Sequence, residues 1–165
     1  SPPEDRSTPA GFRPGCECLA AGTPVWTDRC EVAIEKILPG DLVLSCEVDS
    51  GELVYKPVLR TTVRPAEELV KLRVGKETIE TSGGHPFWVS GQGWLKSRNL
   101  QAGMVLHTLN GPVNVLEVGV SPAEPTYNLI VADFNTYFVG SQKILSHDNT
   151  ILRPTNAIVP GLVIK

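Results

Sequence analysis

The chain has 165 residues, of which 41% are hydrophobic and 20% are charged, with a formal net charge of −3 and a pI of about 5.6. This composition is typical of one globular domain with a single sizeable core. Lys and Arg are scattered, and no apolar run approaches the ~20 residues of a membrane span, so neither nucleic acid nor a membrane is expected as a partner.

The first part of the chain predicts a flexible leader followed by β-structure. Residues 1 to about 15 hold four of the fourteen prolines and little apolar pattern, and they lack the layout of a signal peptide. Residues 42–56 contain two apolar runs around Asp49-Ser50-Gly51, which predicts a hairpin. Residues 69–80 alternate between apolar and charged side chains around a turn at Gly75-Lys76, which indicates half-buried strands.

The later segments continue this pattern. Residues 104–118 carry Asn110-Gly111, a strong hairpin turn, and residues 126–145 are rich in Tyr, Phe, Ile and Val. Helical signals are limited to single turns within 32–41 and 94–103. The sequence therefore predicts an all-β domain of many short strands with one or two short helical turns.

Four cysteines and three histidines are the candidates for chemistry. The cysteine spacing, 16, 18, 30 and 46, fits no common zinc pattern, although a zinc-stabilised domain using Cys16, Cys18, Cys30 and a His stays open. Cys30 and Cys46 are predicted to be small buried fillers, and His107 a structural strand residue. Cys16 is a linker residue, a thiol that exchanges with a neighbour, or half of a strained disulfide.

Three blocks in order carry a family resemblance. "CLAAGTPVWTDRCEVAIEKILPGDLVLS" begins at Cys18, "TSGGHPFWV" spans 81–89, and "TYNLIVADFNTYFVGSQKILSHDN" spans 126–149. Together they resemble Hint domains, the fold of inteins and hedgehog autoprocessing domains. The sequence is most similar to the bacterial intein-like and pretoxin-type Hint domains.

The resemblance implies a horseshoe-shaped, pseudo-symmetric β fold that processes its own chain. Residues 1–17 are then an N-terminal flank, 18–149 the autoprocessing domain and 150–165 a C-terminal flank. It also implies a single-turnover reaction in cis, with the flanking segments as substrate, water or a small thiol as acceptor, and no cofactor or metal. A monomer is expected, as part of a bacterial secreted or cell-surface precursor.

The residues support such chemistry at the N-terminal junction. A thiol is the best side-chain nucleophile near neutral pH, so Cys18 can attack the carbonyl of Glu17 and form a thioester. The departing amide nitrogen needs a proton, which the His85 imidazole can supply as a general acid. The Ser82 hydroxyl and nearby backbone N–H groups are candidate donors to the oxyanion.

The C-terminal junction departs from the family pattern, in which a terminal Asn directly follows His and cyclises. Here the order is His147-Asp148-Asn149-Thr150. Either Asp148 replaces the cyclising Asn, which predicts slow cleavage, or Asn149 cyclises and Thr150 is the hydroxyl nucleophile after the junction. The second alignment puts His147 one residue early, which moves a strand side chain to the opposite face.

Two further departures concern the later steps. Asn128 stands where many relatives have Asp, and Asn135 where many have His, and an Asn side chain cannot titrate. We therefore expect thioester formation and cleavage at Cys18, with weaker C-terminal cleavage and little splicing. The alternatives are a degenerate Hint scaffold that serves as a spacer or binding module, and a cysteine hydrolase that uses Cys18 and His85 in trans.

Overall fold

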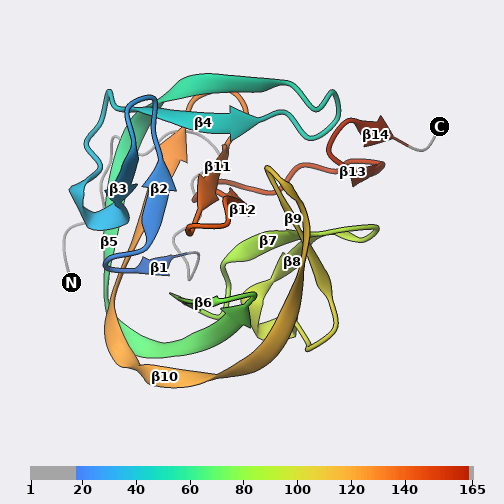
Figure 1. Ribbon diagram of the computed structural model, residues 1–165. Coiled ribbons are helices and arrows are strands. Elements are labelled where there is room, and N and C mark those ends of the chain that lie inside the picture. Colours follow the sequence, from blue (N-terminus) through green and yellow to red (C-terminus); the bar gives the residue numbers. More distant parts are fainter. Residues whose placement is uncertain (1–17, 164–165) are drawn as a thin grey trace.

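The computed structural model describes residues 18–163 and consists almost entirely of β-strands (Figure 1). The strands are β1 (Leu19–Ala20), β2 (Pro24–Trp26), β3 (Glu31–Ala33), β4 (Leu42–Cys46), β5 (Leu53–Val74), β6 (Glu77–Thr81), β7 (Pro86–Val89), β8 (Gly93–Lys96), β9 (Val105–Thr108), β10 (Gly111–Val131), β11 (Thr136–Val139), β12 (Ile144–His147), β13 (Ala157–Val159) and β14 (Leu162–Val163). Two short 3₁₀ turns, η1 (Ile34–Lys36) and η2 (Ser97–Asn99), lie in the two segments predicted to form helical turns. The all-β prediction is confirmed.

Two strands are much longer than the sequence predicted. β5 has 22 residues and β10 has 21, and they pair antiparallel along most of their length as a curved outer arc (Figure 1). Pro122 and Pro125 interrupt the alternation in the sequence and suggest breaks between shorter strands. In the structure they fall at register shifts around Ser121, Glu124 and Thr126, where β-bulges bend the ribbon without ending it.

The predicted hairpins are present. β4 and β5 are joined across 47–52 with Leu42 opposite Pro57, and β5 and β6 turn at Gly75-Lys76. β9 and β10 pair with Thr108 opposite Gly111, so that the two-residue turn is Leu109-Asn110, one residue earlier than the predicted Asn110-Gly111. All observed pairings among residues 18–163 are antiparallel, as expected for strands joined mainly by short turns.

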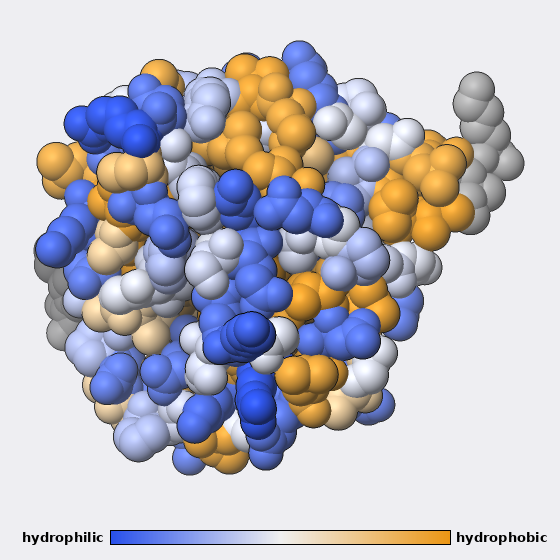
Figure 2. Space-filling model, in the orientation of Figure 1, coloured by the Kyte–Doolittle hydropathy of each residue, from blue (hydrophilic) through white to orange (hydrophobic). Residues whose placement is uncertain are grey.

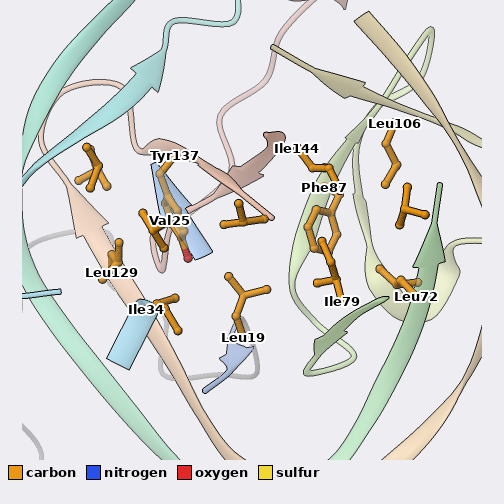
Figure 3. Packing of buried hydrophobic residues seen from close by; sticks show 14 of the residues in the cluster. Leu19, Val25, Ile34, Leu72, Ile79, Phe87, Leu106, Leu129, Tyr137 and Ile144 are labelled. Atoms are coloured by element: carbon orange, nitrogen blue, oxygen red, sulfur yellow. The ribbon is translucent and has the colours of Figure 1, made fainter. Parts of the chain in front are cut away.

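The main hydrophobic core lies inside the arc. It has one group of side chains around Val25, Leu129 and Tyr137, and another around Phe87, Leu106 and Leu72 (Figure 3). A smaller second cluster contains Cys46, Trp88, Phe138, Leu145 and Ala157. β11 and β12 contribute to both clusters, since all eight of their residues are buried.

Two short segments near opposite ends of the described chain meet in this core. β1 pairs with both β6 and β10, with Leu19 opposite Thr81 and Tyr127. β12 pairs with β11, β7 and β9, and Ser146 lies opposite Phe87. Figure 1 shows β1 and β12 both within the space enclosed by the long strands. The fold therefore brings the residue before β1 and the residues after β12 into one region.

Outside that region the cysteine predictions had mixed outcomes. Cys46 is 2% exposed, as predicted, but Cys30 is exposed in the turn between β2 and β3, so the prediction that it is buried was wrong. Cys30 follows the bend at Asp28-Arg29, whose polar residues keep the turn at the surface. His107 lies in β9 as predicted, and partial burial lowers its pKa.

The surface is a mosaic of polar and apolar side chains (Figure 2). Within residues 18–163, no helix is both long enough and apolar enough to cross a membrane.

Candidate functional site

Cys18 lies directly before β1, is 0% exposed and is held by Ser82 on both sides of its backbone. The Ser82 N–H donates to the Cys18 carbonyl oxygen at 2.8 Å, and the Cys18 N–H donates to the Ser82 Oγ at 2.8 Å. The second bond involves the nitrogen of the Glu17–Cys18 peptide bond. Ser82 therefore contacts the nitrogen side of the bond that the sequence predicted to be cut, while Glu17 and Cys16 lie outside the described residues.

The loop from Ser82 to His85 is fixed by η2. The Ser97 hydroxyl donates to the Ser82 carbonyl at 2.6 Å, and the Ser97 N–H donates to the His85 carbonyl at 2.9 Å. The Arg98 N–H adds a bond to the Gly83 carbonyl at 3.0 Å. These bonds satisfy the carbonyls of a buried turn and give it one conformation, which is the requirement for a positioned side chain.

His85 is 0% exposed, and its ring packs against Phe87 with centroids 5.0 Å apart. Its Nε2 atom lies 2.5 Å from the Ser146 Oγ on β12. A hydrogen bond to one ring nitrogen fixes both the orientation of the imidazole and the role of the other nitrogen. Ser146 thus orients the His85 ring. Ser146 itself lies on β12, directly before His147, so the two histidines are connected through neighbouring residues of one strand.

Tyr137 on β11 connects the two ends electrostatically. Its hydroxyl donates to the Asn128 Oδ1 at 2.6 Å, and the Leu129 N–H donates to the same oxygen at 2.7 Å. Burial raises the pKa of Tyr137 well above its usual value, and the negative charges of Asp148 and of a Cys18 thiolate raise it further. Tyr137 and Asn128 are both 0% exposed.

The Asp148 carboxyl group is 0% exposed and accepts hydrogen bonds at both oxygens. Oδ2 accepts from the Val131 N–H at 2.7 Å and from the Asn135 side-chain amide at 3.1 Å, and Oδ1 accepts from the Thr150 hydroxyl. Burial raises the pKa of Asp148 to about 6, despite the opposing effect of these donors. Because the pKa is so close to neutrality, both protonation states are accessible at physiological pH.

His147 is 4% exposed, and its ring meets Trp94 edge to face at 5.0 Å. Its Nδ1 lies 2.9 Å from the Asp148 main-chain carbonyl oxygen and 3.6 Å from the Asp148 Oδ1. An imidazole N–H at that carbonyl polarises the Asp148–Asn149 bond.

The remaining C-terminal residues are also positioned by the core. Asn149 is 2% exposed and its N–H donates to the Leu129 carbonyl at 3.0 Å. Asn135 has φ +57°, a left-handed conformation that Asn tolerates well, and its amide also donates to the Val131 carbonyl at 2.9 Å. From the sequence, Asn135 is only a position where many relatives have His. In the structure its side-chain amide donates a hydrogen bond to the Asp148 carboxyl group.

A family model described as the pretoxin HINT domain matches residues 25–152. The chain belongs to the pretoxin Hint family. The family resemblance stated from the sequence blocks is thereby confirmed, and the match covers all candidate residues from Ser82 to Thr150.

Solved structures with the Hint fold agree. The chain is 36% identical to a bacterial intein-like domain from Clostridium thermocellum, with a TM-score of 0.77 over 81% of this chain and 99% of that one. A DnaB intein from Synechocystis sp. PCC 6803 is 14% identical, with a TM-score of 0.69 over 79% and 97% of the two chains. The gp41-1 intein is 23% identical, with a TM-score of 0.67 over 79% and 97%. No curated protein matches the chain.

In this Hint domain the structure gathers the residues predicted from the sequence into two adjoining groups. Ser82 contacts Cys18 and His85 directly follows in the same turn, whereas the other group centres on Asp148 with His147 and Thr150. Reasoning from the sequence missed Ser97, Tyr137 and Ser146. Each is a common residue in a strand or turn, and only pairing between distant segments reveals its contact.

The structure also bears on the metal alternative. Among residues 18–163, no three or more His, Cys, Asp or Glu side chains gather as a metal site would require. Cys18 is buried against Ser82, while Cys30 is exposed in the turn between β2 and β3.

Proposed function

We propose that this Hint domain cuts its own chain at the Glu17–Cys18 bond through a thioester. The Cys18 thiolate attacks the Glu17 carbonyl carbon, a C–S bond forms and the C–N bond breaks. The nitrogen leaves as the α-amino group of Cys18. Water or an external thiol then attacks the thioester, which releases residues 1–17 and restores the Cys18 thiol.

The observation that carries this proposal is the hydrogen bond from the Cys18 N–H to the Ser82 Oγ at 2.8 Å. It fixes the orientation of the amide nitrogen that must accept a proton as the bond breaks. His85 follows three residues later in the same locked turn, with Nε2 bonded to Ser146 at 2.5 Å. We assign proton delivery to the His85 Nδ1 and orientation of the leaving nitrogen to Ser82.

At the C-terminal side we propose that the reactive bond is Asp148–Asn149. The His147 Nδ1 at 2.9 Å from the Asp148 carbonyl oxygen supports this alignment over the one that uses Asn149. A carboxylate is a poorer substitute for the nucleophilic amide of a cyclising Asn, so cleavage here is slow. The proposed domain boundary then lies after residue 148 rather than 149.

The proposal is tested by intact-mass spectrometry of the purified full chain, with and without a small thiol. We expect thiol-stimulated loss of residues 1–17, which disappears in Cys18→Ala. Cys30→Ala is the matched control, because that thiol is exposed and far from Ser82 in the pairing scheme, and it should process normally. His85→Ala should slow the reaction by roughly 10²- to 10⁴-fold, the usual loss for a general acid.

Two results would contradict the proposal in different ways. A ligated product that joins residues 1–17 to the C-terminal flank would show efficient splicing instead of cleavage. An unchanged mass under all conditions would favour a degenerate scaffold that no longer cuts itself. Some support for that alternative comes from Asn128, Asn135 and Asp148, because each replaces a residue type associated with the later steps.

A further inference from the structure

The segment after the C-terminal junction packs against the body of the domain. β13 and β14 form a hairpin at its end, with Ala157 opposite Val163 and Val159 opposite Leu162. Ala157 is 8% exposed and belongs to the second hydrophobic cluster, alongside Cys46 and Trp88. In Figure 1 this hairpin lies beside the ends of β4 and β8.

Backbone hydrogen bonds attach this hairpin at two separate turns. The Ile158 carbonyl accepts from the Gly91 N–H at 2.8 Å and from the Trp88 indole N–H at 3.2 Å. The Gly161 N–H donates to the Val48 carbonyl at 2.9 Å. The hairpin is thus bound on one side by the β7–β8 turn and on the other by the β4–β5 turn.

A contact between two glycines makes this fit specific. Gly51 in the β4–β5 turn and Gly161 in the hairpin have φ of +77° and +90°. A Cβ on Gly51 would lie 3.0 Å from the Gly161 Cα, which is tighter than most real Cβ contacts, so the facing backbone would have to move by a few tenths of an ångström. Glycine at both positions therefore permits both the left-handed turns and the close approach of the two backbones.

Polar contacts extend the attachment toward the junction. The Thr155 hydroxyl donates to the Asp49 carboxylate, and the Arg153 guanidinium donates to the Asn135 Oδ1 at 2.6 Å. The opposite face of the hairpin points outward, since Leu162 is 55% exposed and Val163 is 37% exposed. Figure 2 shows apolar surface in this part of the molecule.

We propose that residues 46–51 and 88–94 form a docking surface for residues 155–163, and that this segment stays bound after the chain is cut at the C-terminal junction. The docking stands on the contacts above, whereas retention of a natural cleavage product rests on the proposed function. The occupant is this chain's own downstream segment, held by Ala157, by main-chain bonds and by the Gly51–Gly161 contact. A module downstream of the junction then leaves the domain in two stages. The peptide bond is cut first, and the docked segment dissociates from the body afterwards.

The experiment uses the full chain with a protease recognition sequence inserted between Ile151 and Leu152, where Ile151 is 55% exposed. After complete digestion, native mass spectrometry and size-exclusion chromatography at micromolar concentration show whether the C-terminal fragment remains bound. We expect it to remain with the body. Because an added protease makes the cut, failure of self-processing does not affect the outcome.

Ala157→Glu and Leu162→Glu form a matched pair, since both add one carboxylate to the same fragment. Ala157→Glu buries it in the apolar cluster and should release the fragment, with at least tenfold weaker retention, about 1.4 kcal/mol. Leu162→Glu puts the charge on the exposed face and should leave the fragment bound. Circular dichroism of the uncut chains checks that the body stays folded. Dissociation of the unmodified fragment, or equal retention of the Ala157→Glu fragment, would overturn the proposal.

Discussion

At the scale of single residues, the site depends on which atom each polar group contacts. Ser82 holds the Cys18 amide from both sides, and the Ser146 hydroxyl orients His85. Asp148 has the most unusual environment, because a fully buried carboxyl group accepts hydrogen bonds from Val131, Asn135 and Thr150.

Asp148→Asn should accelerate C-terminal cleavage. An Asn amide has the shape of the carboxyl group, and its oxygen can keep the bonds from Val131 and Asn135. Its nitrogen can donate to the Thr150 hydroxyl, but it loses the bond that the carboxylate accepts from the Thr150 backbone N–H. The variant then has an amide nucleophile beside a carbonyl that His147 polarises. We expect cleavage after residue 148 to be faster by about tenfold or more, equivalent to a barrier about 1.4 kcal/mol lower.

Intact mass followed over time measures this rate, because the product lacks residues 149–165. Asn149→Asp in the unmodified background is the control and should have little effect. If Asp148→Asn is inert while Asn149→Asp abolishes cleavage, the alignment with Asn149 as the cyclising residue is correct.

The raised pKa of Asp148 predicts a pH-dependent stability. The folded-state pKa is about 6, above the ordinary value of 3.8, so the folded chain holds this proton more tightly than the unfolded chain. The contribution is therefore fully present below about pH 4 and is lost as the pH rises through about 6. A shift of about two pKa units corresponds to about 3 kcal/mol.

Urea unfolding of wild type and Asp148→Asn across this range measures the effect, on freshly purified chains whose intact mass shows no cut. The variant should gain stability relative to wild type as the pH rises from about 4 to about 7. A stability difference that does not change with pH would show that Asp148 titrates normally.

At the scale of elements, the β11–β12 hairpin is the part that connects the chemistry to the core. It presents Tyr137 toward Asn128, Ser146 toward His85, and His147 toward the Asp148 carbonyl. Its turn is held by Glu77, whose carboxylate accepts from the Ser141 and Gln142 N–H groups at 2.9 and 3.1 Å. The geometry of this turn should therefore influence the whole site.

Gly140→Ala should destabilise the domain by about 2 kcal/mol, combining left-handed strain with a steric clash. Gly140 has φ +79°, and a Cβ there would lie 2.6 Å from the Glu77 Oε1 that holds the turn. Gly119→Ala is the control, because Gly119 has no heavy atom within 4 Å of its would-be Cβ. It should be neutral or slightly stabilising, since Ala loses less backbone entropy than Gly in a strand. Thermal unfolding of both variants makes the comparison, and equal midpoints would contradict the prediction.

At the scale of the whole molecule, the long strands β5 and β10 enclose a core that contains both Cys18 and Asp148, the residues of the two proposed junctions. β1 is inserted between β6 and β10, and β12 lies against β7, β9 and β11. Tyr137 lies in that core (Figure 3). Burial raises the pKa of its hydroxyl, and negative charge on Asp148 or on a Cys18 thiolate raises that pKa further. Changes at Tyr137 should therefore affect both ends together.

Tyr137→Phe should lower the rates at the Cys18 and Asp148 junctions in parallel. The change removes the hydroxyl that bonds the Asn128 Oδ1, at a cost of about 1 kcal/mol in stability. Tyr55→Phe is the control, because Tyr55 is 46% exposed and lies on the outer part of β5. Intact mass resolves the two cuts in one experiment. A change at one junction alone would indicate that Tyr137 serves only that end.

The sequence by itself determined the all-β class, the hairpin around 49–51, the presence of a hairpin near 110–111 and the family membership, because these depend on local turn chemistry and on blocks read along the chain. It also named Cys18, Ser82, His85 and residues 147–150 as candidate site residues, and their roles stay predictions. Only the tertiary structure decided that the Ser82 Oγ contacts the Cys18 amide nitrogen, that the His147 Nδ1 lies 2.9 Å from the Asp148 carbonyl oxygen, and that Ser146 on β12 bonds the His85 ring. It also revealed the two long strands, the exposed Cys30 and the docked C-terminal hairpin. These features arise from contacts between residues tens of positions apart, which no local pattern encodes.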